Sequence, residues 1–142
     1  MLFFIGGTCA GKRAAVNARV ASPCWHSAYD GKMLEEWRGH ADGQGCLVLE
    51  GWERWIETAL HRSSDNDRLR AELCSTLDDL RDWEVEQNAA VVLVMLEMGR
   101  GIVPMSPVAR RLRDLNGWLA QDAAARSKAV WHVRHGLVKP LI

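Results

Sequence analysis

Short continuous apolar runs alternate along the chain with longer stretches in which apolar residues recur every three or four positions. Runs of the first kind are typical of strands that are buried on both faces. The segments expected to be strands are residues 2–5, 24–28, 46–49, 90–96, 129–133 and 137–142. The run at 90–96 is rich in valine and is the strongest of these predictions.

The amphipathic stretches between these runs are expected to be helices. They are residues 11–20, 31–38, 52–60, a helix through Leu69, Leu73, Leu77 and Leu80, and a long helix that starts near Pro107. Asp30 would cap the second of these helices, and proline suits a first helical turn. Strands that alternate with helices predict an α/β fold of three layers, with a mostly parallel sheet flanked by helices. A chain of 142 residues is expected to form one domain, residues 1–142.

Composition and charge exclude several classes of protein. The formal net charge is zero, so neither nucleic acid nor an anionic membrane is expected as a partner. The first apolar run is too short for a signal peptide, and no apolar run approaches the roughly 18 residues of a transmembrane helix. The four cysteines lack the C-x-x-C spacing of zinc sites and are typical of reduced thiols. A cytoplasmic protein is therefore expected.

The strongest candidate for chemistry follows the first expected strand. It fits the pattern G-x-x-x-x-G-K, with Gly6, Gly7, Thr8, Cys9, Ala10, Gly11 and Lys12. Glycines in such a loop let successive backbone N–H groups point into one concavity, and the next helix presents its positive end to phosphates. Lys12 would reach the β- and γ-phosphates. These residues are predicted to bind a nucleoside triphosphate; the alternative is a structural glycine turn.

The residue after the lysine departs from the pattern. Ser or Thr normally stands there and supplies a hydroxyl to Mg²⁺, whereas this chain has Arg13. A guanidinium cannot bind Mg²⁺, but it can pair with phosphate oxygens through two hydrogen bonds. Arg13 is therefore expected to help bind the nucleotide. The substitution is expected to impair metal-dependent phosphoryl transfer more than nucleotide binding.

Three further residues are candidates for the site. Glu50 ends the strand at 46–49 and is expected to hold Mg²⁺ directly or through water; the alternative is an acid favoured by the dipole of the following helix. Glu97 follows the strand at 90–96, at the kind of strand end where α/β sites form, and is a candidate for nucleotide binding. His40 lies in an expected loop, where a lone histidine is most often idle, although imidazole can act as a nucleophile towards phosphorus.

Four blocks of the sequence carry a resemblance to a known family. They are residues 2–12, 46–60, 91–104 and 110–131, and the most specific part is 97–104, Glu-Met-Gly-Arg-Gly-Ile-Val-Pro. Together they resemble the bifunctional adenosylcobinamide kinase / adenosylcobinamide-phosphate guanylyltransferase family of cobalamin biosynthesis. The resemblance covers nearly the full chain, with a shortening between Gly45 and Cys46. It implies a RecA-like P-loop core and a homo-oligomer, with a homotrimer as the family's form.

The resemblance also implies a two-step transferase. A nucleoside triphosphate phosphorylates the aminopropanol hydroxyl of adenosylcobinamide, and GTP then transfers GMP through a histidine. The implied substrates are GTP or ATP and a corrinoid, and the implied cofactor is Mg²⁺. Lys12 and His40 are the implied catalytic residues, because His40 falls at the position of the family's guanylylated histidine.

Several polar positions of the family pattern are changed, whereas the apolar framework is kept. The family has Ser at the position of Arg13, Arg at that of Glu36 and Cys at that of Gly51. It has Asn at the positions of Leu96 and Ala120. Two other functions therefore stay open. One is a degenerate paralogue that binds nucleotide or corrinoid without turnover, and the other is a small P-loop kinase with a different acceptor.

Overall fold

The structure is a computed structural model, and it describes residues 1–41, 45–98 and 106–142. The strands are β1 (Leu2–Gly6), β2 (Pro23–Ser27), β3 (Cys46–Glu50), β4 (Ala90–Leu96), β5 (Ala129–Arg134) and β6 (Leu137–Pro140). The α-helices are α1 (Lys12–Arg19), α2 (Trp37–His40), α3 (Trp52–Leu60), α4 (Asn66–Gln87) and α5 (Pro107–Arg126). Two 3-10 helices, η1 (Ala28–Asp30) and η2 (Leu34–Glu36), lie between β2 and α2. Every expected strand is present.

Within the described ranges, the strands form one six-stranded sheet in the order β2-β3-β4-β1-β5-β6. The pairs from β2 through to β5 are parallel, whereas β6 runs antiparallel to β5. The expected α/β class with a mostly parallel sheet is therefore confirmed. Because β1 to β5 point the same way, their carboxyl ends meet at one edge of the sheet, which is where sites form in such folds.

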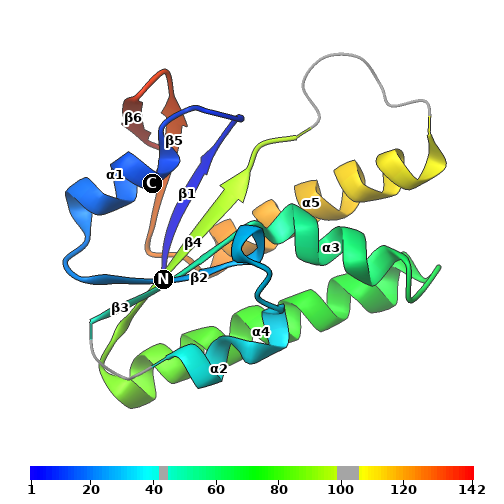
Figure 1. Ribbon diagram of the computed structural model, residues 1–142, viewed down its shortest axis with the longest axis horizontal. Helices are drawn as coiled ribbons and strands as arrows, with labels where there is room; N and C mark the ends of the chain where they lie inside the picture. The colour runs from blue at the N-terminus through cyan, green and yellow to red at the C-terminus, as the bar shows by residue number, and fades with distance from the viewer. Residues whose placement is uncertain (42–44, 99–105) are drawn as a thin grey trace.

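Helices cover both faces of the sheet, which gives the molecule three layers (Figure 1). On one face, Val16 of α1 packs over Phe4, Val48 and Val94 of the central strands. On the opposite face, α3, α4 and α5 cover the neighbouring strand positions, such as Leu93. Successive strand residues point to opposite faces, so a continuous apolar run fills both cores at once.

The segment that follows β2 differs from the helix expected over residues 31–38. Gly31 has a left-handed conformation, with φ of 81°, and its N–H donates to the Ala28 carbonyl, so it closes η1. Asp30 is consequently the last residue of η1 and caps no helix there. Met33 is extended, with ψ of 150°, and the helical turns begin only after it. The expectation was wrong because Gly31 and the extended Met33 interrupt the segment, and only Leu34 and Trp37 of its apolar residues pack against the core.

The two long helices begin at side-chain caps. Asp65 accepts a hydrogen bond from the Arg68 N–H at 3.0 Å at the start of α4. Ser106 accepts one from the Ala109 N–H at 3.4 Å at the start of α5, and Pro107 lies in the first turn as expected. Among the described residues, no helix combines the length and the apolar content needed to cross a bilayer.

Candidate nucleotide-binding site

The loop between β1 and α1 has the tight backbone that the glycine pattern predicts. Cys9 and Gly11 both have left-handed conformations, with φ of 58° and 98°. The Ala10 N–H donates to the Gly7 carbonyl at 3.3 Å, and Gly11 is the N-cap of α1. The chain therefore folds back on itself directly before the helix, and the positive end of α1 faces the loop.

The hairpin between β5 and β6 supports this loop from behind. A Cβ atom on Gly6 would lie 2.3 Å from the carbonyl oxygen of Val133, and one on Gly11 would lie 3.2 Å from Cα of Gly136. The Gly136 N–H donates to the Ala10 carbonyl at 2.8 Å. The sequence pattern thus reflects close backbone packing at both Gly6 and Gly11, and at Gly11 a left-handed backbone conformation as well.

Lys12 lies across the loop that precedes it. Its ammonium nitrogen donates to the carbonyl oxygens of Gly6 at 3.1 Å and Gly7 at 2.6 Å. Burial lowers the pKa of Lys12, although the carboxylates of Glu53 and Glu50 act against this shift. The ammonium is thus held at the mouth of the loop, and anion binding there is expected to weaken as the pH rises through this lowered pKa.

A cavity of about 500 Å³ opens over the loop, a size that suits a small-molecule ligand. The residues that line it are Thr8, Cys9, Ala10, Gly11, Lys12, Arg13, Ala14, Tyr29, Glu53, Arg54 and Leu96. The structure therefore brings six of the predicted nucleotide-binding residues, Thr8 to Arg13, to one cavity, whereas Gly6, Gly7, Glu50 and Glu97 do not line it. Three of its side chains are cations, Lys12, Arg13 and Arg54, and one is a carboxylate, Glu53. This balance suits a polyanion such as a triphosphate.

Arg13 and Glu50 form an ion pair beside the loop. The Nε atom of Arg13 donates to Oε2 of Glu50 at 3.1 Å, and Nη2 donates to Oε1. Ser27 also donates to Oε1, at 2.8 Å. The Glu50 side chain is only 4% exposed, and hydrogen bonding to it raises the pKa of Arg13. Both carboxylate oxygens of Glu50 are therefore engaged.

These contacts test the expected metal role of Glu50. In P-loop proteins, the hydroxyl of the residue after the lysine ligates Mg²⁺, which demands near-octahedral oxygen ligands. Arg13 replaces that hydroxyl, and its guanidinium occupies both oxygens of Glu50. The residues present therefore do not fit a Mg²⁺ ion held by the protein.

Tyr29, Glu53 and Arg54 are site residues that sequence reasoning missed. The Tyr29 hydroxyl donates to Oε2 of Glu53 at 2.6 Å, and the Arg54 guanidinium carbon lies 5.8 Å from the centre of the Tyr29 ring. Oε1 of Glu53 is buried and has no hydrogen-bond partner among the described residues. One signal could have found Glu53 and Arg54, because both lie in the first turn of the helix that follows β3, at the carboxyl edge of the sheet.

Glu97 lies next to the loop but outside the residues that line the cavity. Its backbone N–H donates to the Gly6 carbonyl at 2.8 Å, and its carboxylate lies 2.8 Å from Nε2 of His132. Leu96, the preceding residue, does line the cavity. Glu97 thus joins the ends of β1, β4 and β5, and its role in nucleotide binding stays a prediction.

Asn116 of α5 is a further polar residue that the sequence did not single out. Its side-chain nitrogen donates to the Leu96 carbonyl at 2.8 Å, so it fixes the end of β4. The family pattern places an amide four residues later, where this chain has Ala120. A shift of four residues moves about one helical turn along the same face, which makes Asn116 hard to find by aligning motifs.

His40, the expected nucleophile, packs against β2. Its ring centre lies 5.0 Å from that of His26, and its backbone carbonyl lies 3.5 Å from the Cys24 sulfur. Its helix, α2, contacts the C-terminal part of α4, where the rings of Trp37 and Trp83 meet edge to face at 6.1 Å. His40 is not among the residues that line the cavity over the loop. The structure therefore keeps His40 apart from Lys12.

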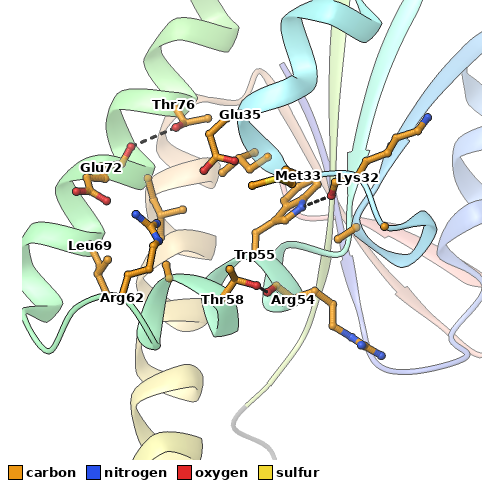
Figure 2. Close-up of a pocket in the computed structure, with 15 residues that line it drawn as sticks. Lys32, Met33, Glu35, Arg54, Trp55, Thr58, Arg62, Leu69, Glu72 and Thr76 are labelled. Carbon is orange, nitrogen blue, oxygen red and sulfur yellow. Dashed lines mark hydrogen bonds between the residues drawn. The ribbon is translucent and has the colours of Figure 1, made fainter.

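A second cavity of about 410 Å³ lies beside the first, between α3, α4 and the segment that follows η1 (Figure 2). Its walls include the apolar side chains of Trp55, Leu69 and Leu73. Trp55 is fixed in the wall, because its indole N–H donates to the Lys32 carbonyl at 2.8 Å. Arg54 lines both cavities, so the two are neighbours.

The fold and the loop define the class: this is a P-loop α/β protein. The sequence model of the family described as "Cobinamide kinase / cobinamide phosphate guanyltransferase" matches residues 16–141. The chain belongs to this family. The match begins after the loop at 6–12, so the loop is identified by its own sequence and geometry.

Curated relatives carry matching names. The chain is 34% identical over 104 residues to the bifunctional adenosylcobalamin biosynthesis protein CobP of Pseudomonas aeruginosa. This alignment covers 73% of this chain and 57% of the relative. It is 49% identical over 49 residues to the protein named CobU of Escherichia coli K12, covering 34% and 27%. It is 34% identical over 86 residues to that of Salmonella typhimurium LT2, covering 60% and 42%. The aligned region thus spans at most 57% of each relative's length.

The close approach at Gly6 gives a prediction for stability. Gly6→Ala is expected to lower the free energy of unfolding by about 1–3 kcal/mol, because the added atom overlaps backbone that cannot easily move. Gly7→Ala is the matched control, since a Cβ there meets nothing within 4 Å. The control is expected to change stability by less than about 0.5 kcal/mol. Urea denaturation of both variants measures this, and equal effects would contradict the packing of the loop against β5.

Proposed function

We propose that the protein is a nucleotide-dependent transferase of cobalamin biosynthesis that uses GTP or ATP and acts on adenosylcobinamide or its phosphate. The observation that carries the proposal is the loop at 6–12, where Lys12 bridges two loop carbonyls beneath a cationic cavity. Membership of the family and the names of the relatives support the corrinoid acceptor. A homo-oligomer is part of the proposal on the resemblance alone.

The kinase step follows from the groups at the cavity. The loop N–H groups and Lys12 would neutralise the β- and γ-phosphates. The acceptor hydroxyl attacks the γ-phosphorus, a new O–P bond forms, and the bond from the γ-phosphorus to the bridging oxygen breaks with release of the nucleoside diphosphate. The hydroxyl proton would pass to the carboxylate of Glu53, which lines the cavity.

The neighbouring cavity suits the part of the acceptor that carries this hydroxyl. It adjoins the loop cavity at Arg54 and offers an apolar wall that includes Trp55. An acceptor held there would present its hydroxyl across Arg54 to the γ-phosphate. Such positioning is the larger part of catalysis in phosphoryl transfer. No step is assigned to Mg²⁺ held by Glu50, because that carboxylate is occupied by Arg13.

The guanylyl transfer is the finer part of the proposal. An imidazole nitrogen of His40 would attack the α-phosphorus of GTP, with loss of pyrophosphate, and the corrinoid phosphate would then take the GMP group. The support for His40 is its position in the resemblance, since its ring packs against His26 and not at the cavity. The Arg13–Glu50 pair favours a second candidate function, a paralogue that binds nucleotide without turnover.

The kinase proposal predicts transfer of label from γ-labelled ATP or GTP to adenosylcobinamide. Lys12→Met is expected to lower the rate constant by about 10²–10³-fold, because it removes the charge that stabilises the transferring phosphoryl group. Lys139→Met, at an exposed position on β6, is the matched control and should leave the rate unchanged. Binding of triphosphate without any transfer by the wild-type protein would favour the non-catalytic paralogue.

The guanylyl step predicts a covalent intermediate on His40. After incubation with α-labelled GTP, the denatured protein should retain label that is labile in acid and stable in base, as a phosphoramidate is. His40→Ala should remove the label, whereas His61→Ala, a change at the end of α3, should retain it. Label that persists in His40→Ala would assign the nucleophile to another residue.

A further inference from the structure

Arg13 has hydrogen-bonding capacity left after it pairs with Glu50. A guanidinium carries five N–H donors in a fixed fork. Only the donors on Nε and Nη2 go to Glu50, and among the described residues Nη1 has no acceptor. Arg13 also lines the cavity over the loop. Part of its charge and at least one nitrogen are therefore free to meet a ligand in that cavity.

The surroundings fix this guanidinium in place. The carboxylate of Glu50 is held by Ser27 at 2.8 Å, so it cannot easily follow a moving side chain. On its other side, the guanidinium carbon lies 5.1 Å from the centre of the Trp25 ring, within the range of a cation–π contact. Arg13 thus presents a positive charge beside Lys12, in a position set by its contacts with Glu50 and Trp25, although its side chain is 57% exposed.

A divalent metal would have to compete with this arrangement. To ligate Mg²⁺, Glu50 must first release a guanidinium that binds both of its oxygens, and the freed charge would then repel the metal. Mg²⁺ also gives up its water ligands reluctantly. Arg13 adds one positive charge beside that of Lys12, on the side of the loop where a metal ion would otherwise meet the triphosphate.

From this geometry, we propose that Arg13, positioned by Glu50, takes the place of the divalent cation at the loop, so that the protein binds nucleoside triphosphate without a divalent metal. This inference rests on the proposed function, because it requires a triphosphate in the cavity over residues 6–12. Arg13 is then a determinant of nucleotide binding, and Glu50 is a positioning residue and not a metal ligand.

The test is the affinity for GTP and ATP, measured by titration calorimetry in EDTA and in excess Mg²⁺. The wild-type protein is expected to bind at least as tightly in EDTA as in Mg²⁺. Arg13→Ser should weaken binding in EDTA by about tenfold or more, which is the loss of one charge-assisted hydrogen bond, and should regain affinity in Mg²⁺. Arg13→Lys, which keeps the charge but loses the fork, should lie between the two.

Two controls keep the outcome clear. Arg19→Ser removes an exposed arginine from the last turn of the same helix and should leave both affinities unchanged. If Arg13→Ser alone fails to fold because Glu50 is left as a buried charge, the double variant Arg13→Ser with Glu50→Gln removes that charge as well and should lose affinity in EDTA to the same extent.

The outcomes separate this inference from the proposed function. Wild-type binding that strengthens tenfold or more with Mg²⁺ would overturn the inference and leave the nucleotide-binding function standing. If Arg13→Ser binds triphosphate in EDTA as tightly as the wild-type protein does, the inference is likewise overturned and the nucleotide-binding function is left standing. A wild-type protein that binds no triphosphate in either buffer would overturn both.

Discussion

The parallel pairing of β1 with β4 on one side and β5 on the other determines where the glycine loop of this protein lies. Phe4 of β1 stands in register with Val94 and Trp131, and its side chain is fully buried under α1. Because these strands point the same way, the glycine loop, the start of α3 and the end of β4 meet at one edge. A change in the register of β1 would move the loop away from the β5–β6 hairpin that supports it.

Arg13 and Glu50 form an ion pair at that edge of the sheet. Glu50 is almost fully buried, and a buried carboxylate without a partner is costly. In proteins with the usual loop sequence, a metal ion shared with phosphate can supply the partner charge. Here the chain supplies it through the second residue of α1, so Glu50 is paired before any ligand arrives. This difference links the single substitution after Lys12 to the chemistry of the whole site.

Local patterns in the sequence predicted most of the fold, because a continuous apolar run and a glycine loop depend on neighbouring residues only. The same reasoning failed over residues 31–38, where Gly31 in a left-handed conformation ends η1 and prevents a helix. It also missed contacts between distant segments. Nothing in the sequence indicates that Arg13 reaches Glu50, that Tyr29 binds Glu53, or that Asn116 fixes the end of β4.

A crystal structure of the protein with a non-hydrolysable GTP analogue, grown in the presence of Mg²⁺, would show directly whether Arg13 or a metal ion meets the triphosphate. We expect the triphosphate over residues 6–12, with Arg13 still bound to Glu50 and donating its remaining N–H groups to phosphate oxygens. A Mg²⁺ ion ligated by Glu50, with Arg13 turned away into solvent, would contradict this expectation.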